Sequence, residues 1–211
     1  MALPRTGAGH DQPAAPGEGL SASQLRAMLA AGEGITGLVP GFTQRVIEEE
    51  KAAGRCPALL APVERAVLAR LRSMPPAAFA CLPDISEGLE NRLYRAARQA
   101  TTLEGLYALA KAKRYTHARL RRLVLSAFLG LARGGPPMPP YLHVLGMTDA
   151  GASLLKGCTL PVLARPADAA RLPASAQALW QLEAQADDLY ALCCPAPQPC
   201  GRTLRQPLLR A

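Results

Sequence analysis

The sequence predicts an α+β protein that is mainly α, with a helical bundle followed by a small strand-helix-strand unit and C-terminal helices. The first observation behind this class is that apolar residues between positions 63 and 131 recur at helical spacing. The second is that the period changes near position 141, where short apolar runs flank one helical stretch. The length bounds the number of domains, because 211 residues suffice for one full domain, or one domain plus a fragment, without disulfides or a metal.

The N-terminal region begins with a predicted loop, because residues 7–19 are rich in Gly and Pro and show no apolar period. Structure is expected to start after this loop. Ser21 or Ser23 can cap a short helix that is stopped by Gly32 and Gly34. A second helix is expected to follow Pro40 and to end at Gly54.

A third helix is framed by Pro57 and Pro62, since proline favours helix starts. A further helical turn is expected at 77–82, after two prolines at 75 and 76 break the run. The apolar residues of the third helix repeat at helical spacing, at Val63, Val67, Leu68 and Leu71.

The best-patterned helix is expected after Pro83, where Asp84 and Glu87 can form a capping box. Its two faces differ in character: one is apolar and packs, and the other carries arginines three residues apart. The apolar stripe consists of Leu89, Leu93, Ala96, Ala97 and Ala100, and the basic ladder of Arg92, Arg95 and Arg98.

Two more helices complete the predicted bundle. A second capping box, Thr101 with Glu104, opens a helix that runs to Lys111. Thr116 then caps a long helix that ends at Gly134. Three helices with short connections predict a compact bundle.

The C-terminal part is predicted as strands at 141–145 and 159–164 with a helix at 149–156 between them. This order predicts a small parallel pair joined by a right-handed crossover. Further helices are expected at 167–171 and 175–192. The proline-containing tail after residue 194 is predicted to be disordered.

The charge of the chain is concentrated in one segment. Residues 92–133 carry ten cations and a single acid, Glu104, for a net charge of +9, whereas the other residues, with 14 cations and 15 acids, net −1. A concentrated positive field favours a polyanion, and nucleic acid is the preferred partner. A solvated helical face is the alternative interpretation.

Two constellations within the chain suit phosphates. Ser21, Ser23 and Arg26 place hydroxyls and a guanidinium at a helix start, although serine caps are also common in helices that bind nothing. Residues 111–122 place six cations around another helix start, together with Tyr115 and His117. Tyr115 can stack on an unpaired base or pack as a hydrophobic staple, and His117 can be a surface residue.

Several site classes are not expected. The six cysteines are scattered without a C-x-x-C pair or a nearby histidine at ligand spacing, so we predict free thiols and no metal ligands. His143 is interpreted as structural. No paired carboxylates, Ser/His/Asp set or P-loop occurs, so no catalytic residue is assigned. No apolar run reaches the roughly 20 residues that span a bilayer, and the N-terminus lacks a signal layout, which predicts a cytoplasmic protein without membrane contact.

Three motifs are similar to those of one known family: DISEGLENR at 84–92, KRYTHARL at 113–120 and PYLHVLG at 140–146. They resemble the bacterial tRNA(Met) cytidine acetate ligase family, which is nucleotidyltransferase-like. The resemblance extends upstream through RTGAGHD at 5–11 and LSASQLR at 20–26. Downstream it extends to DDLY at 187–190, so it covers nearly the whole chain except the tail.

The resemblance implies a reaction that composition alone does not. The family activates acetate with ATP to an acetyl-adenylate and acetylates N4 of the wobble cytidine in elongator tRNA(Met). By resemblance, Arg5 contacts the nucleotide and Ser21, Ser23 and Arg26 lie by its phosphates, with Mg²⁺ left open as a companion of ATP. The same resemblance implies that the basic region grips the tRNA, through Arg92, Arg95, Lys111, Lys113, Arg114, Tyr115, Arg119 and Arg122.

One departure from the family is that no H-x-G-H motif, which handles the ATP phosphates, occurs in this sequence. The chain is therefore expected to be a C-terminal portion that is inactive alone, and a separately encoded N-terminal half stays open as a partner. Residues 1–34 are interpreted as the end of a Rossmann-like nucleotidyltransferase domain, 35–194 as the RNA-binding domain and 195–211 as the disordered tail. The alternative function is a stand-alone, non-catalytic RNA-binding helical module.

Overall fold

The computed structural model describes residues 20–86, 88–136 and 138–210. Contacts group these residues into two compact units. Unit 1 holds the described residues up to Leu60 together with Ala191–Gln198, and unit 2 holds Ala61–Tyr190 and the described residues from Pro199 onward. The structure thus differs from the predicted division after residue 34, because the two N-terminal helices belong to one unit.

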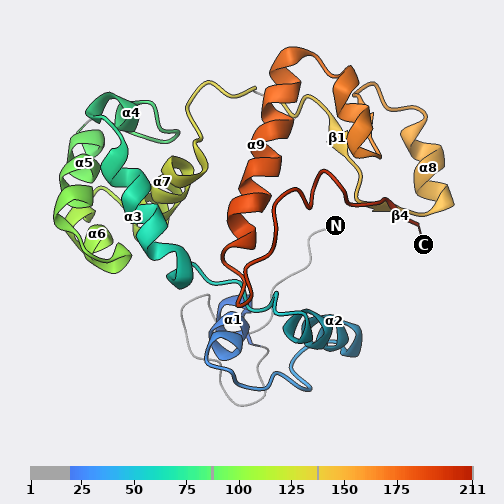
Figure 1. The fold of residues 1–211 in the computed structure, drawn as a ribbon, viewed down its shortest axis with the longest axis horizontal. Helices are drawn as coiled ribbons and strands as arrows, with labels where there is room; N and C mark the ends of the chain where they lie inside the picture. Colours follow the sequence, from blue (N-terminus) through green and yellow to red (C-terminus); the bar gives the residue numbers. More distant parts are fainter. Residues whose placement is uncertain (1–19, 87, 137, 211) are drawn as a thin grey trace. The chain divides into compact units, whose positions relative to one another are not determined.

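Unit 1 contains the two predicted helices, α1 (Ala22–Ala30) and α2 (Gly41–Ala52) (Figure 1). Ser21 caps α1 by accepting a hydrogen bond from the backbone of the first turn, which decides between the two predicted caps. The chain turns away after α2 at Gly54, which has a left-handed φ of +69°. A β-carbon at this position would lie 2.7 Å from the methyl group of Ala196, so the site requires glycine both for its backbone and for its space.

Little apolar surface is buried within unit 1. Neither α1 nor α2 contains a buried residue. The buried residues that the structure describes in this unit are Ser21, Ile35, Ala191 and Cys194. Because burial of apolar surface is the main stabilising contribution to a fold, unit 1 has a small core of its own.

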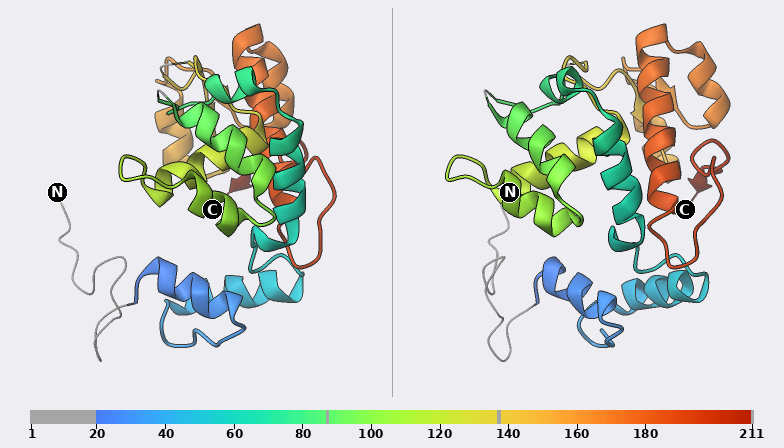
Figure 2. Two further views of the ribbon diagram at one scale, coloured as in Figure 1. Left: turned by 90° about the vertical axis from the view of Figure 1, so that its left-hand side faces the viewer. Right: turned by 60° about the vertical axis from the view of Figure 1, so that its left-hand side comes forward.

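Unit 2 begins with the predicted helical bundle, whose helices pack as α3 on α5 and α7, α4 on α5, and α6 on α5 and α7 (Figure 1, Figure 2). The helices follow the predicted apolar stripes, and their most buried side chains form the core between them. The bounds are η1 (Ala61–Val63), α3 (Glu64–Ser73), α4 (Pro76–Ala80), α5 (Leu89–Gln99), α6 (Leu103–Ala110) and α7 (His117–Leu129). The fully buried core residues include Val67, Leu71, Phe79, Leu89, Leu106, Leu120, Leu123 and Val124.

Three helix ends differ from the prediction. The N-cap of α5 is Gly88, in a left-handed conformation, rather than the predicted box that began at Asp84. The N-cap of α6 is Thr102, one residue after Thr101, and its side chain accepts from the backbone N–H of Gly105. α7 ends at Leu129, because Gly130 already adopts a left-handed φ of +77° that stops the helix.

The C-terminal part of unit 2 contains the predicted strand-helix-strand unit. Strand β1 (Leu142–His143) pairs in parallel with β3 (Val162–Leu163), and α8 (Asp149–Leu155) lies between them in the chain. A second parallel pair, which was not predicted, joins β2 (Gly146–Met147) to β4 (Leu209–Arg210). With the helices, these short strands confirm the predicted α+β, mainly α class.

A second hydrophobic core covers this small sheet. It is built around Trp180 of α9 (Ala174–Ala191), which packs edge-on against the rings of Tyr141 and His143 at centroid distances of 6.2 and 4.7 Å. His143, although exposed, therefore contacts an aromatic ring. The remaining buried members are Leu163, Ala169, Leu172 and Ala176. Ala169 belongs to η2 (Pro166–Arg171), and Leu172 directly follows it.

The C-terminal tail differs from its predicted disorder, because α9 holds it by polar contacts. The backbone N–H of Gly201 donates to Asp188 Oδ1 at 2.6 Å. The hydroxyl of Thr203, which is buried, donates to the carboxylate of Asp187. The chain then ends in strand β4. The composition of the tail predicts disorder, because composition carries no information about hydrogen bonds to distant residues such as Asp187 and Asp188 of α9.

Candidate nucleic-acid interface

The exposed cations of the basic segment lie mainly on α5, on α7 and in the connection before α7. On α7, residues at helical spacing pack into the core, while Arg121 and Arg122 remain exposed. Lys113 and Arg114, in the connection from α6, are exposed as well. The helix period thus places at least four cations at the surface, beside the start of one helix.

The start of α7 is electrostatically unusual. Thr116 is its N-cap, as predicted, and accepts a hydrogen bond from the backbone N–H of Arg119 at 3.3 Å. His117 is the exposed first residue of the helix, in agreement with its interpretation as a surface residue. The first turn contains no acid. Because the N-terminus of a helix carries a partial positive charge, cations there are unfavourable and an anion is favoured.

Asp84, in the connection between α4 and α5, contacts two arginines of α7. Its backbone carbonyl accepts hydrogen bonds from the guanidinium of Arg119, through Nε at 3.1 Å and through Nη2. Its carboxylate Oδ2 accepts from Nη2 of Arg122 at 3.2 Å. One residue therefore contacts two arginines that lie one helical turn apart on α7.

Two predicted RNA-binding residues also have structural roles. Arg92 donates from Nε to the carbonyl oxygen of Ala110 at 2.8 Å and from Nη2 to that of Lys111 at 2.7 Å. These carbonyls end α6 and have no partner within the helix. Lys111 in turn donates from Nζ to the carbonyl oxygen of Tyr115 at 2.7 Å, so both side chains hold the connection between α6 and α7.

The basic ladder on α5 is not uniform. Arg98 lies 3.4 Å above the ring of Tyr94 and donates to the carbonyl oxygen of Met74 at 3.3 Å. Arg95 is exposed, and its Nε donates at 3.3 Å to the carbonyl oxygen of Asn91 in its own helix. Arg95 is therefore more available to a ligand than Arg98.

Tyr115 is 5% exposed, which favours packing over stacking on a base. The guanidinium carbons of Arg114 and Arg119 lie 5.8 and 5.7 Å from its ring centroid, within the range of a cation–π interaction. A stacking platform needs an exposed ring face, and this ring contributes instead to the support of two cations.

The structure gathers most of the predicted RNA-binding residues around the α6–α7 connection, with Arg95 farther along α5. Sequence reasoning placed Asp84 at a helix cap and so missed its contacts with α7. It counted Arg121 among the six cations of residues 111–122 without naming it as an RNA-binding residue, and its Nη2 lies 3.9 Å from Glu104 Oε1. The gathered predicted residues are Arg92, Lys111, Lys113, Arg114, Tyr115, Arg119 and Arg122.

The predicted phosphate-binding residues on α1 differ in availability. Ser21 is buried, and its Oγ accepts a hydrogen bond from the backbone N–H of Gln24 at 3.3 Å. In return, the side-chain oxygen Oε1 of Gln24 accepts from the backbone N–H of Ser21. Ser23 and Arg26 are exposed and one turn apart on a helix start without acids. Arg5 lies outside the described residues.

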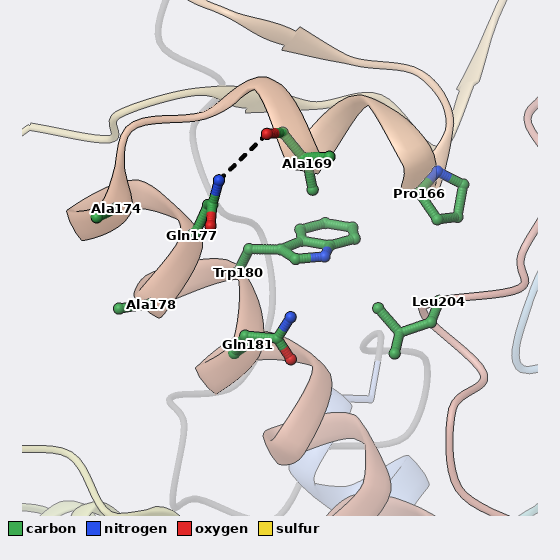
Figure 3. Close-up of a pocket in the computed structure, with 9 residues that line it drawn as sticks. Pro166, Ala169, Ala174, Gln177, Ala178, Trp180, Gln181 and Leu204 are labelled. Carbon is green, nitrogen blue, oxygen red and sulfur yellow. Dashed lines mark hydrogen bonds between the residues drawn. The ribbon is translucent and has the colours of Figure 1, made fainter.

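A pocket of about 500 Å³ lies beside Trp180 in the second core (Figure 3). Gln177 at its wall donates from Nε2 to the carbonyl oxygens of Ala170 at 3.2 Å and Leu172 at 2.8 Å. The other lining residues are Pro166, Ala169, Ala170, Ala174, Ala178, Gln181 and Leu204. Because its lining is uncharged and mostly apolar, this pocket does not suit a phosphate.

Among residues 20–86, 88–136 and 138–210, no three His, Cys, Asp or Glu side chains gather in a way that could hold a metal ion. Within the same ranges, no helix combines the length and the apolar character needed to cross a membrane.

The family model described as HIGH Nucleotidyl Transferase matches residues 1–204. A tRNA(Met) cytidine acetate ligase of Kosmotoga olearia is 30% identical over 211 residues, covering 89% of this chain and 50% of the relative. The ligase of the same name from Syntrophomonas wolfei is 30% identical over 179 residues, covering 78% of this chain and 43% of the relative. The chain therefore spans about half the length of the curated relatives that it matches.

Two solved structures of Thermotoga maritima TmcAL share the fold. The apo form has a TM-score of 0.85 at 24% identity and covers 97% of this chain and 54% of its own. The form bound with alpha-thio ATP has a TM-score of 0.80 at 24% identity, with coverage of 91% and 53%. At this level of identity the likeness supports the fold.

Proposed function

Because the chain belongs to the HIGH nucleotidyl transferase family, and within it to the tRNA(Met) cytidine acetate ligases, we propose that it carries the tRNA-binding portion of such a ligase. The complete enzyme would form N4-acetylcytidine at the wobble position of elongator tRNA(Met), with acetate and ATP as co-substrates. This proposal includes a cytoplasmic location, where tRNA is modified.

The observation that carries the proposal is the gathering of cations around the α6–α7 connection. Lys113, Arg114 and Arg122 are exposed, and the structure describes few acids near them. Positive side chains that neutralise phosphates supply most of the sequence-independent affinity for a nucleic acid. An RNA backbone would also relieve the unfavourable position of these cations at the start of α7.

Hydrogen bonds to backbone carbonyls hold several of the basic side chains of this surface in place. Arg92 and Lys111 hold the connection between α6 and α7, and Asp84 holds Arg119. Guanidinium groups that are already oriented lose less conformational entropy when they bind a phosphate. We therefore assign Lys113, Arg114 and Arg122 to direct phosphate contact, together with Arg95 farther along α5, and the other predicted residues mainly to support.

The ATP-related part of the proposal concerns α1. Ser23 and Arg26 fit a phosphate group, since both are exposed at a helix start that lacks acids. Ser21 would contribute through the cap that orders this helix start, and Arg5 completes the proposed set. When bound, ATP supplies the energy that activates acetate, and Mg²⁺ can accompany its phosphates. The binding of alpha-thio ATP by the Thermotoga maritima protein supports ATP as the nucleotide in this proposal.

The partner in this proposal is the part of the enzyme that the chain does not span, including the H-x-G-H motif. Support comes from unit 1, in which α1 and α2 contain no buried residue. On α2, Phe42 and Val46 are one turn apart and 68% and 54% exposed. An apolar stripe of this kind is typical of a surface that packs against another polypeptide. The chain alone would then lack ligase activity.

The proposal is tested by the binding of the 211-residue chain to elongator tRNA(Met) across a salt series, with initiator tRNA(Met) as competitor. We expect the double variant Lys113→Glu, Arg114→Glu to bind at least tenfold more weakly and to show a flatter salt dependence. The matched control, Arg65→Glu with Arg70→Glu, reverses two exposed arginines of α3 in the same bundle and should bind nearly as the unchanged chain does.

Equal losses in the two double variants would mean that only net charge matters and would contradict a defined RNA surface. Tight binding without preference for the elongator tRNA would favour a stand-alone RNA-binding module instead.

A further inference from the structure

Asp84 combines a rare backbone conformation with contacts to two cations. It is the one non-glycine residue with a positive φ, +60°, among those that the structure describes. This left-handed region costs free energy for residues with a β-carbon, although Asp and Asn tolerate it better than most. Residues in such conformations are often found where function requires a particular geometry.

The conformation of Asp84 directs both of its oxygen-bearing groups toward α7. The carbonyl accepts from Arg119, and the carboxylate accepts from Arg122. The two arginines are three residues apart, so their side chains emerge next to each other on the helix surface. Asp84 thus limits the positions of two neighbouring guanidinium groups at once.

The guanidinium of Arg122 keeps most of its donors for a ligand. A guanidinium has five N–H donors, and the contact with Asp84 engages Nη2. The side chain of Arg122 is 62% exposed in this pair. An exposed ion pair adds little to stability, so stabilisation of the bundle is a weak explanation for an acid at this place.

We propose that Asp84 is a positioning residue for RNA binding, which holds Arg122 through its carboxylate and Arg119 through its carbonyl so that both guanidinium groups face the RNA backbone. This inference rests on the proposed function, because it concerns the same basic surface. It assigns to Asp84 no contact with the RNA itself.

A simple charge effect makes the opposite prediction. An acid beside a phosphate-binding surface repels RNA, so its removal should strengthen binding if Asp84 does nothing else. If Asp84 positions Arg122, its neutralisation should weaken binding instead. The sign of the change therefore separates the two explanations.

The test compares Asp84→Asn with Glu104→Gln in the full chain, using elongator tRNA(Met) as the probe. Asn tolerates the left-handed backbone and keeps the carbonyl that binds Arg119, while its side chain has lost the charge. Glu104 is the matched control, because it also faces an arginine of α7 but at 3.9 Å, in a loose and exposed pair. We expect about fivefold weaker binding for Asp84→Asn and unchanged or slightly stronger binding for Glu104→Gln.

The salt series supplies a second measurement. Loss of one phosphate contact should reduce the slope of log K against log salt by about 0.7, whereas removal of a repelling charge should not reduce it. The effect should also disappear in an Arg122→Gln background, because the carboxylate acts through that side chain. If Asp84→Asn lowers the unfolding temperature of the bundle, Asp84→Gly, which suits the same φ, replaces it in the comparison.

Binding by Asp84→Asn that equals or exceeds that of the unchanged chain overturns the positioning role. The role is also overturned if Asp84→Asn weakens binding by the same factor in the Arg122→Gln background as in the unchanged chain. The proposed function fails separately, when the unchanged chain does not bind the tRNA or when the Lys113 and Arg114 reversal has no effect.

Discussion

The guanidinium of Arg92 donates to the carbonyl oxygen of Ala110 at 2.8 Å, so a cation on α5 closes the C-terminus of α6. A second hydrogen bond, to the carbonyl of Lys111, extends the same contact into the connection that leads to α7. The residue that supports this connection is therefore one of the residues that the charge pattern indicated for RNA binding.

Replacement of Arg92 by Gln should lower the free energy of unfolding by about 1 kcal/mol, since two hydrogen bonds to helix-terminal carbonyls are lost at a partly exposed site. Urea-induced unfolding measures this change. Arg95→Gln is the control, because Arg95 bonds only within its own turn, and it should change the free energy by less than about 0.5 kcal/mol. Equal stability of the two variants would assign Arg92 to the ligand rather than to the fold.

Tyr115 should behave as a packing residue. Tyr115→Ala should lower the free energy of unfolding by about 3 kcal/mol, because the ring is buried and its removal leaves a cavity. Tyr115→Leu, which refills much of the space, should recover a large part of this loss. A Tyr115→Ala protein of unchanged stability that no longer binds tRNA would instead identify the ring as a base-stacking surface.

The attachment of the tail to α9 predicts a change in protease sensitivity. Asp188→Ala removes the acceptor of the Gly201 N–H and should expose the tail to trypsin, with faster cleavage at Arg202 and Arg205. Gln185→Ala, at an exposed position of the same helix, is the control and should leave the cleavage rate unchanged. Rapid cleavage of the unchanged chain at these arginines would show that the tail is not held.

Tyr141 predicts a loss of stability at alkaline pH. Burial of the phenol, followed by the nearby negative charge of Glu183, raises the pKa of Tyr141 far above its ordinary value. The folded protein therefore favours the neutral phenol, so its stabilising contribution is complete below the ordinary pKa of about 10 and is lost as the pH rises above it. Tyr141→Phe should show a shallower decline in unfolding free energy above about pH 10, in urea titrations. Identical declines would contradict this assignment.

The helices could be predicted because their signals are local. Thr116 precedes an apolar stripe of period 3.6, and the cap and the stripe are both visible within one short segment. The contacts of Asp84 could not be predicted in this way, since Arg119 lies 35 residues farther along the chain. The same applies to Thr203, whose hydroxyl donates to Asp187 of α9, 16 residues earlier in the chain. Local pattern therefore located the basic surface, and tertiary contacts determined which of its cations are fixed.

The exposed stripe on α2 leads to the last prediction. The 211-residue chain alone should show no acetate-dependent exchange of pyrophosphate into ATP, because the residues proposed for activation are supplied by the rest of the enzyme. Addition of a polypeptide that carries the H-x-G-H half of a family member should restore exchange. Phe42→Asp should reduce this restoration at least tenfold without lowering the unfolding temperature, since Phe42 is exposed in the chain described. The control Glu49→Lys, at an exposed charged position of the same helix, should restore exchange nearly as well as the unchanged chain. Exchange by the chain alone would contradict the proposed division of activity between the two halves.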